Sequence, residues 1–459
     1  MKLKKYFSAE RLNNLLYDTR SKVLKVARYL TATGTLAGFA LLIYLFGFEH
    51  TEAELQTSFL LMDALLVLLL LLFLLRWLYA FRRRKFLRER AIEASLMVLI
   101  VLRLADLLLL GSQLFLWMQA VLEVSYRNFI LLLLFASVLI ELSRFSSRLT
   151  SLRISPNRAF LLSFVILIAG GTLMLMLPAM TTQAGSMPLL DALFTAVSAS
   201  CVTGLIVVDT ATYFSFRGQL VILLLIQVGG LGILAFAAFF ASYLSGGFGL
   251  RQKMMIPDYF DNETLAASRS LLREIVFITF FIEGGTFFLL YFTWGIPFDS
   301  LGQKLFFSAF HAVSAFCNAG FSLFTNGLYE EVVRSNYILH LVIAISLILG
   351  AIGFSPIRDI FSPRRLRDRL EHPWKDWMLS TRIAFNVSVV LLVIGTTLIF
   401  LLEQHNTLSE KNLTEALISS FFQSATTRTA GFNTVDIGQL AAPTLVVMMI
   451  LMFIGGASA

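Results

Sequence analysis

The sequence predicts an all-α polytopic membrane protein built partly from a repeated unit. Three observations predict this class. Of the 459 residues, 57% are hydrophobic and only 14% are charged. The apolar residues gather in runs of about 20, the length that a helix needs to cross a bilayer. The basic residues gather in clusters between these runs, as they do in the cytoplasmic loops of membrane proteins.

Ten apolar runs have the length and hydropathy of membrane-spanning helices. A soluble protein of this size could not bury so much apolar surface, so we assign the runs to a bilayer. We expect spans at about 29–48, 57–79, 94–120, 128–143, 159–180, 218–245, 273–293, 337–357, 382–402 and 441–459.

The basic clusters orient these spans. Lys and Arg are abundant before the first span, FRRRKFLRER (81–90) follows the second, and RDIFSPRRLRDR (358–369) follows the eighth. The intervening clusters follow the fourth and sixth spans. Every cluster therefore lies after an even number of spans, which predicts an inner-membrane protein with a cytoplasmic N-terminus. This topology accounts for the net positive charge without a nucleic-acid partner.

Three further apolar segments are too short to cross a bilayer. They lie at about 189–201, 304–317 and 414–427, each between two spans on the outer side. Apolar segments of this length are typical of re-entrant helices.

The ends of these segments repeat. They read FTAVSASCVTGLIVVD (194–209), FHAVSAFCNAGFSLFT (310–325) and FFQSATTRTAGFNTVD (421–436), with single glycines at Gly204, Gly320 and Gly431. A second glycine signature follows each one, as VGGLG (228–232), LGAIG (349–353) and IGGAS (454–458). Two matched landmarks at a spacing of about 110 residues indicate duplicated units. We place these units at 158–250, 251–369 and 370–459.

The repeated loops have the chemistry of a cation filter. Irregular backbone at membrane depth is tolerated where it lines a water-filled path. A short helix that ends there presents the negative end of its dipole, which favours a cation. Carbonyl oxygens of the following loop can replace the water shell of the ion. Glycine suits the narrow point because it has no Cβ and adopts positive φ at little cost.

SASCVTGL, SAFCNAGF and TTRTAGFNTVD resemble the pore loops of the Trk/Ktr/HKT potassium-transporter superfamily. The resemblance covers about 158–459 and implies four such units around a pseudo-fourfold pore. It implies that one Gly per unit goes with K⁺ preference, whereas Ser in the first unit goes with Na⁺ in some plant members. The matching filter positions, with K⁺ bound mainly by their carbonyls, are Val202, Thr203, Gly204, Leu205, Asn318, Ala319, Gly320, Phe321, Thr429, Ala430, Gly431 and Phe432.

The resemblance also implies a gate and partners. An intramembrane loop that gates the pore would begin at the third glycine signature, at Gly455, Gly456 and Ser458. The family pattern implies a homodimer bound to a cytosolic ring that senses nucleotides. We find no nucleotide-binding motif in this chain and expect no bound cofactor, with K⁺ as cargo and Na⁺ as a possible coupling ion.

The sequence departs from the family pattern in two places. No fourth unit follows IGGASA, and three units cannot close a fourfold pore, so we expect the natural protein to continue further. Residues 1–157 add a four-helix membrane region before the first unit. A voltage sensor is one interpretation of that region. A sensor would carry Arg at every third position through the membrane, whereas Arg144 and Arg148 lie at the cytoplasmic edge and Arg103 with Asp106 fits a buried pair.

Several polar or small residues near the loops allow two interpretations. Gly229, Gly230 and Gly232 could be hinges, but small residues also permit close helix packing. Gln227 could face the pore or bond to a neighbouring helix. Arg428 could bond to loop carbonyls or pair with an acid such as Asp436. His311 could be an internal polar contact or a proton relay. Cys201 and Cys317 could back the filter, or they could form a metal pair or a disulfide. Asp209 and Asp436 could attract cations or be ordinary loop residues.

Uptake of K⁺ is the function that these observations favour. A Na⁺-selective or K⁺/Na⁺-cotransporting protein is an alternative within the same class. A regulatory or sensory membrane protein that kept the pore units without conducting is another. A membrane enzyme is disfavoured because the five His residues are scattered without metal-ligand spacing.

Overall fold

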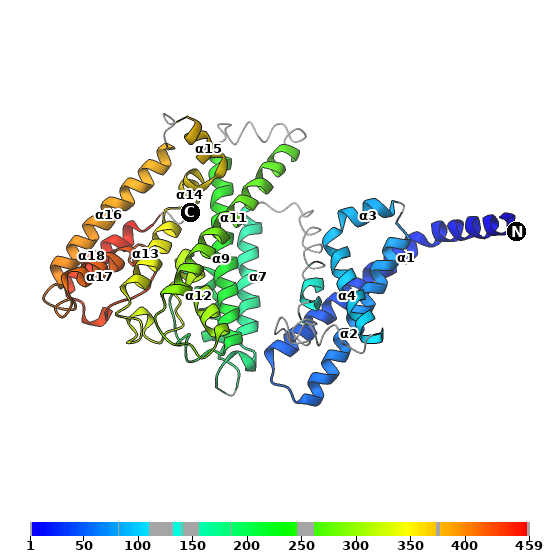
Figure 1. Cartoon of the computed structure of the whole chain (residues 1–459), viewed down its shortest axis with the longest axis horizontal. Helices are drawn as coiled ribbons and strands as arrows, with labels where there is room; N and C mark the ends of the chain where they lie inside the picture. Colours follow the sequence, from blue (N-terminus) through cyan, green and yellow to red (C-terminus); the bar gives the residue numbers. More distant parts are fainter. Residues whose placement is uncertain are drawn as a thin grey trace. The chain divides into compact units, whose positions relative to one another are not determined.

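A computed structural model of the chain describes residues 2–80, 82–109, 131, 133–138, 140, 156–183, 185–245, 261–372 and 377–456 (Figure 1). Regular structure in these residues is helical, apart from one isolated bridge between Thr181 and Phe214. The predicted all-α class is therefore confirmed. The chain divides into two compact units, Met1–Pro156 and Asn157–Ala459.

The first unit contains two long apolar helices and shorter companions. Its helices are α1 (Lys2–Gly47), α2 (Glu52–Leu78), α3 (Arg83–Glu89) and α4 (Ala91–Leu109). Helix α2 begins at a capping box, in which the Thr51 hydroxyl accepts from the backbone N–H of Glu54 and the Glu54 carboxylate accepts from that of Thr51. Met62, Leu66 and Ile100 are fully buried in the apolar core of this unit.

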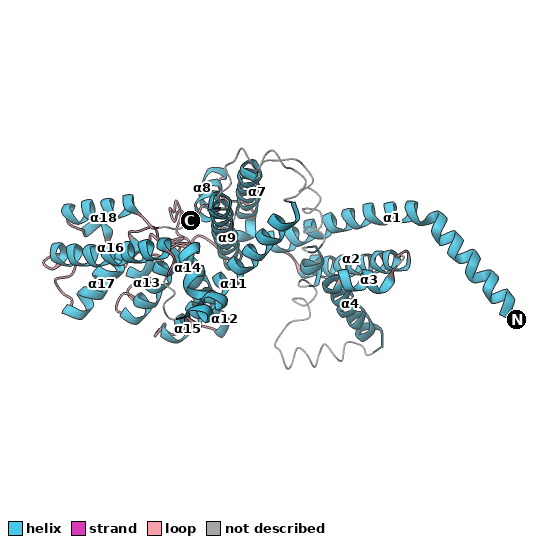
Figure 2. Cartoon of the chain, turned by 90° about the horizontal axis from the view of Figure 1, so that it is seen from above, coloured by secondary structure: helices cyan, strands magenta, loops and turns pink. Residues whose placement is uncertain are grey.

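The second unit contains the segments that the sequence predicts to be three repeats. Figures 1 and 2 show its helices as α7 (Pro156–Leu175), α8 (Leu189–Ser200), α9 (Phe216–Ser245), α11 (Asp261–Thr293), α12 (Leu301–Phe316), α13 (Tyr337–Ala351), α14 (Phe354–Phe361), α15 (Pro363–Glu371), α16 (Leu379–Glu403), α17 (Leu413–Thr426) and α18 (Ala442–Ile454). Short 3₁₀ turns lie at η1 (Pro178–Met180), η2 (Gly327–Tyr329) and η3 (Ile437–Gln439).

Most predicted spans coincide with helices. In the described residues, five helical segments are long and apolar enough to cross a membrane, namely Thr19–Gly47, Glu52–Leu78, Phe216–Ala235, Leu272–Thr293 and Leu379–Glu403. The predicted spans at 94–120 and 128–143 lie partly outside the described residues. The three short segments are helices α8, α12 and α17, each within a few residues of its predicted bounds.

The prediction of one span over 337–357 is wrong. Helix α13 ends at Ala351, and Gly353, with a φ of +93°, separates it from α14. An L-residue seldom adopts this conformation, so glycine allows the break. Beyond it, the buried carboxylate of Asp359 accepts from Arg365, Thr381 and the backbone N–H of Met378, each at 2.9 Å. Burial raises the pKa of Asp359, but these hydrogen bonds outweigh it and leave the pKa below its usual value.

The repeats pack in sequence order. Helix α9 of the first repeat packs against the short helix α12 of the second, and α13 of the second packs against the short helix α17 of the third. In both cases the long helix that follows one short helix packs against the next short helix along the chain.

Candidate selectivity filter

The three short helices α8, α12 and α17 each end in a loop with a left-handed glycine. Gly204, Gly320 and Gly431 have φ values of +81°, +71° and +77°. Two residues before each glycine lies another residue with positive φ, namely Val202, Asn318 and Thr429. Val202 and Asn318 have nearly equal φ values of +56° and +57°, a left-handed conformation that non-glycine residues seldom adopt, whereas Thr429 has a φ of +155°. The first two loops therefore share a specific fold at this position, and the third differs there.

The loops lie side by side in sequence order. A Cβ added to Gly204 would lie 2.6 Å from the Ala319 carbonyl oxygen, and one added to Gly320 would lie 2.6 Å from that of Ala430. A Cβ on Gly431 would lie 3.7 Å from the Gly320 Cα. Each of the first two glycines thus faces the carbonyl before the glycine of the next loop, so the structure brings the predicted filter residues together.

Each loop is tied to its own helix by a hydroxyl group. Ser198 donates to the carbonyl of Leu205 at 2.7 Å, Ser314 to that of Phe321 at 2.7 Å, and Thr426 to that of Phe432 at 2.8 Å. The acceptor is always the residue after the filter glycine. Among the described hydrogen bonds, none uses the carbonyls of the three preceding residues of each loop. Those nine carbonyls remain available to an ion, whereas the Leu205, Phe321 and Phe432 carbonyls have a protein partner.

Replacing Thr426 by Val should weaken the third loop. Valine keeps the shape of threonine but removes the donor to the Phe432 carbonyl, a loss of about 1–3 kcal/mol for a buried acceptor. We expect a lower K⁺ over Na⁺ ratio in flux measurements on the full-length protein, with little change in yield. Thr426→Ser keeps the hydroxyl and should retain the ratio. Equal ratios in Thr426→Val and wild type would contradict the role of this hydrogen bond.

A cavity adjoins the helix end of the loops. Its volume is about 340 Å³, and its lining includes Val202, Thr203, Asn318 and Thr429 from all three loops. Residues at the C-terminal ends of α8 and α12, namely Cys201, Phe316 and Cys317, line it as well. Helix C-termini carry partial negative charge. The cavity is therefore a favourable place for a cation next to the available carbonyls.

The TrkH family profile, described as a cation transport protein, matches residues 125–459 of this chain. The chain belongs to the TrkH family. The family is one of cation transporters and not of enzymes. A crystal structure of the potassium transporter TrkH from Vibrio parahaemolyticus shares the fold, with a TM-score of 0.50 and 20% identity over 72% of this chain and 63% of that chain.

Curated relatives of this TrkH-family chain are potassium uptake proteins by name. Ktr system potassium uptake protein B from Bacillus subtilis is 37% identical over 67% of this chain and 66% of its own length. The protein of the same name from Vibrio alginolyticus is 34% identical over 66% of this chain and 64% of its own length. Potassium/sodium uptake protein NtpJ from Enterococcus hirae is 34% identical over 67% of this chain and 66% of its own length. The chain thus spans slightly under two thirds of these relatives.

The predicted gate of this TrkH-family chain begins beside the third loop. Helix α18 ends at Gly455, whose φ is +66°. The buried Arg428 donates from Nε to the Gly455 carbonyl at 3.3 Å and from Nη2 to the Ser388 hydroxyl at 3.1 Å. Arg428 therefore binds a loop carbonyl, the first of its two predicted alternatives. Of the other predicted gate residues, a Cβ on Gly456 would lie 2.9 Å from the Cβ of Ala351, and Ser458 lies outside the described residues.

The predicted outer acids order their own loops. Asp209 accepts from the backbone N–H groups of Ala211 and Thr212 at 2.8 Å. Asp436 accepts from the N–H of Gly438 at 2.9 Å and from Gln439 at 3.0 Å. These contacts support the interpretation of both acids as loop residues.

The side chains behind the second loop are held by protein contacts. His311 lies 2.9 Å from the Phe307 carbonyl through Nδ1 and 3.1 Å from the Ser322 hydroxyl through Nε2, as an internal polar contact. In the orientation that satisfies both ends of its amide, Asn318 donates to the Leu347 carbonyl and accepts from the Ala351 N–H, each at 3.2 Å. This contact leaves the Asn318 backbone, rather than its side chain, to face an ion.

Sequence analysis missed Glu283. This residue of α11 is 4% exposed, and its carboxyl group accepts from Gln227 of α9 at 3.2 Å. Gln227 therefore bonds to a neighbouring helix, the second of its two predicted alternatives. The available signal was an acidic residue inside the otherwise apolar stretch 275–293, a pattern that marks functional positions in membrane helices.

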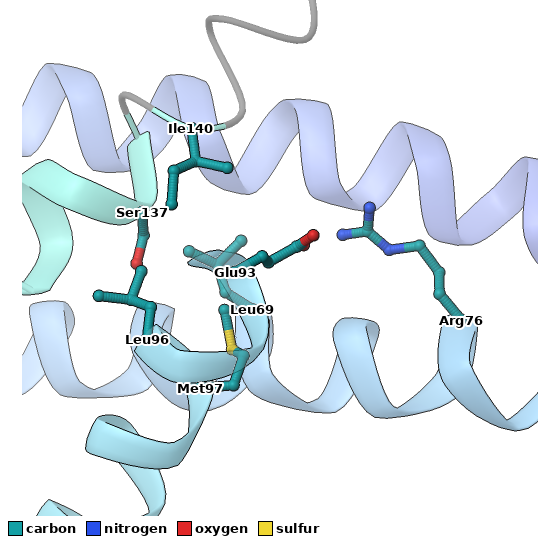
Figure 3. A pocket seen from close by; sticks show the side chains of 7 residues that line it. All are labelled: Leu69, Arg76, Glu93, Leu96, Met97, Ser137 and Ile140. Atoms are coloured by element: carbon teal, nitrogen blue, oxygen red, sulfur yellow. The ribbon is translucent and has the colours of Figure 1, made fainter. Parts of the chain in front are cut away.

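The first unit holds a small polar site of its own. Figure 3 shows the Glu93 carboxylate and the Arg76 guanidinium pointing toward one another across a cavity of about 10 Å³. Arg76 also donates to the Thr31 hydroxyl at 3.0 Å, and Glu93 lies 3.5 Å from Arg90. Arg76 and Glu93 both lie near helix ends that the sequence analysis predicts to be cytoplasmic. The side chains of Arg103, Asp106, Arg144 and Arg148 lie outside the described residues.

Proposed function

We propose that this chain is the ion-conducting part of a potassium uptake protein of the cytoplasmic membrane. The observation that carries the proposal is the threefold recurrence of the loop: a positive-φ glycine, unbonded carbonyls before it and a hydroxyl-anchored carbonyl after it. Carbonyl rings of this kind replace the hydration shell of K⁺. The names of the relatives from Bacillus subtilis and Vibrio alginolyticus support K⁺ as cargo.

The proposed path runs past the three loops to the cavity beneath them. K⁺ loses water against the carbonyls of residues 202–204, 318–320 and 429–431, and regains it in the cavity. The backbone that begins at Gly455 gates the cavity, and the contact of Arg428 with the Gly455 carbonyl couples this gate to the third loop.

Partners and ion coupling extend this proposal. We infer a homodimer with its N-terminus in the cytoplasm, controlled by a cytosolic nucleotide-sensing ring. The name of the Enterococcus hirae relative, a potassium/sodium uptake protein, favours Na⁺ coupling as the second candidate activity.

Ion flux through the purified protein tests the proposal. The protein is reconstituted in proteoliposomes and K⁺ entry is followed with a K⁺-sensitive dye, with and without Na⁺. We expect K⁺ entry that exceeds Na⁺ entry by at least about tenfold, equivalent to about 1.4 kcal/mol. Faster entry with external Na⁺ would establish coupling. Vesicles that admit neither ion would overturn transport in favour of a sensory role, and preferred Na⁺ entry would overturn the K⁺ assignment.

A further inference from the structure

A buried cluster behind the second loop contains the acid that sequence analysis missed. Glu283 of α11 accepts from Nε2 of Gln227 at 3.2 Å through one carboxyl oxygen. Its other carboxyl oxygen lies 3.9 Å from Sγ of Cys317, the residue directly before the loop. Three segments therefore meet at one carboxyl group: α9 of the first repeat, α11 of the second, and the end of the re-entrant helix α12.

Cys317 is enclosed on a second side by α9. A Cβ added to Gly230 would lie 2.7 Å from Cys317 Sγ, so the thiol rests directly against the glycine backbone. Gly230 lies one helical turn after Gln227, so both residues share a face of α9. The cluster thus fixes the position of Cys317 between two repeats.

If Glu283 were ionised, the cluster would contain an unpaired charge and an unsatisfied amide oxygen. Glu283 is 4% exposed, and in the described part of the chain no Lys, Arg or His contacts it. Cys317 is the titratable side chain against it. Oε1 of Gln227 is buried and lacks a partner in the described residues. A charged carboxylate in this setting would be uncompensated at membrane depth, and an amide oxygen would stay unsatisfied beside it.

A proton on Glu283 would remove the unpaired charge and provide a donor for the unsatisfied oxygen of Gln227. A neutral acid accepts a hydrogen bond from the amide N–H through one oxygen and donates its own proton to the amide oxygen through the other. Such a reciprocal pair would satisfy Gln227 on both sides. Neither Glu283 nor Gln227 lines the 340 Å³ cavity, whereas Cys317 does. The carboxyl group therefore lies behind the ion path rather than in it.

We propose that Glu283 is an uncharged positioning residue that pairs reciprocally with Gln227 and holds Cys317, and with it the second filter loop, against the first repeat. The ion-transport part of this inference rests on the proposed function. The protonation of Glu283 does not, because it can be measured without transport.

Infrared spectroscopy tests the protonation directly. The purified full-length protein is compared with Glu283→Gln as a difference spectrum. We expect the carbonyl band of a protonated carboxylic acid in wild type that is missing from the variant. Glu274→Gln is the matched control on the same helix, because Glu274 forms a salt bridge with Arg358 at 2.8 Å. Carboxylate bands, rather than an acid band, in the Glu283 difference spectrum would overturn the proposal.

Flux measurements test the positioning role. Glu283→Gln preserves an uncharged hydrogen-bonding group, so we expect K⁺ uptake and K⁺/Na⁺ ratio within about twofold of wild type. Glu283→Leu and Gln227→Leu remove the pair and should each lower the ratio by about tenfold. A Glu283→Gln variant that folds but has lost uptake would show that charge is required, which would make Glu283 an ion or proton site. Absence of K⁺ uptake in wild type would refute the proposed function and leave the infrared result to decide the protonation.

Discussion

Replacing Gly204 by Ser is expected to remove K⁺ selectivity while leaving an inserted protein. The added Cβ would lie 2.6 Å from the Ala319 carbonyl oxygen, closer than real Cβ atoms come to any heavy atom. Gly204 also has a φ of +81°, which costs an L-residue about 1–2 kcal/mol. The neighbouring atom is backbone of the adjacent loop, so relief requires both loops to move. The distances between the carbonyl oxygens proposed to bind K⁺ would then change. We therefore expect the K⁺ over Na⁺ flux ratio to fall at least about tenfold.

Gly170→Ala provides the control for this experiment. Gly170 lies in α7, and a Cβ there meets nothing within 4 Å. Alanine in a helix is if anything slightly stabilising, so selectivity and yield should stay at the wild-type level. An unchanged flux ratio in Gly204→Ser would remove the first loop from the filter.

Replacing Gly229 by Ala is expected to have the largest effect on stability. In the first repeat the α9 backbone packs directly on the end of α8, and a Cβ at Gly229 would overlap the Ser200 carbonyl oxygen. The same relation recurs in the second repeat, where a Cβ at Gly350 would overlap the Phe316 carbonyl oxygen. Overpacking of this kind costs about 1–3 kcal/mol. We expect Gly229→Ala to lower the melting temperature in detergent and to abolish K⁺ uptake, because the end of α8 carries the first loop.

Gly232→Ala, three residues further along α9, is the matched control. Its Cβ would meet only the ring of Phe164, at an ordinary 3.5 Å. Its melting temperature and uptake should equal those of wild type. If Gly229→Ala behaved like Gly232→Ala, the close approach of α9 to the end of α8 would not contribute to stability. Gly229 would then be better explained as a hinge.

The glycine contacts also decide between two interpretations that the sequence left open. Gly229 and Gly230 contact Ser200 and Cys317 through their backbone, so both serve close packing. Gly353 and Gly455 have positive φ and lie where α13 and α18 end. Helix α9 instead continues through VGGLG to Ser245. The signature therefore supports packing at Gly229 and Gly350 and a helix break at Gly353 and Gly455.

The sequence by itself determined the class of the protein, its repeats and the loops that form the candidate filter. Hydropathy runs and the positions of basic residues depend on local composition, and the recurring Gly204, Gly320 and Gly431 follow from a backbone conformation that few other residues adopt. These features depend on the local sequence, so they can be found without knowing any tertiary contact.

Only the tertiary structure decided which partner each polar group near the loops bonds to. The hydroxyl of Ser314 donates to the Phe321 carbonyl, and the guanidinium of Arg428 donates to the Gly455 carbonyl. The carboxyl group of Glu283 accepts from Gln227. The last two contacts join residues 27 and 56 positions apart. A buried polar group must find a partner wherever the fold supplies one, and the sequence does not show which distant atom will lie within hydrogen-bond distance.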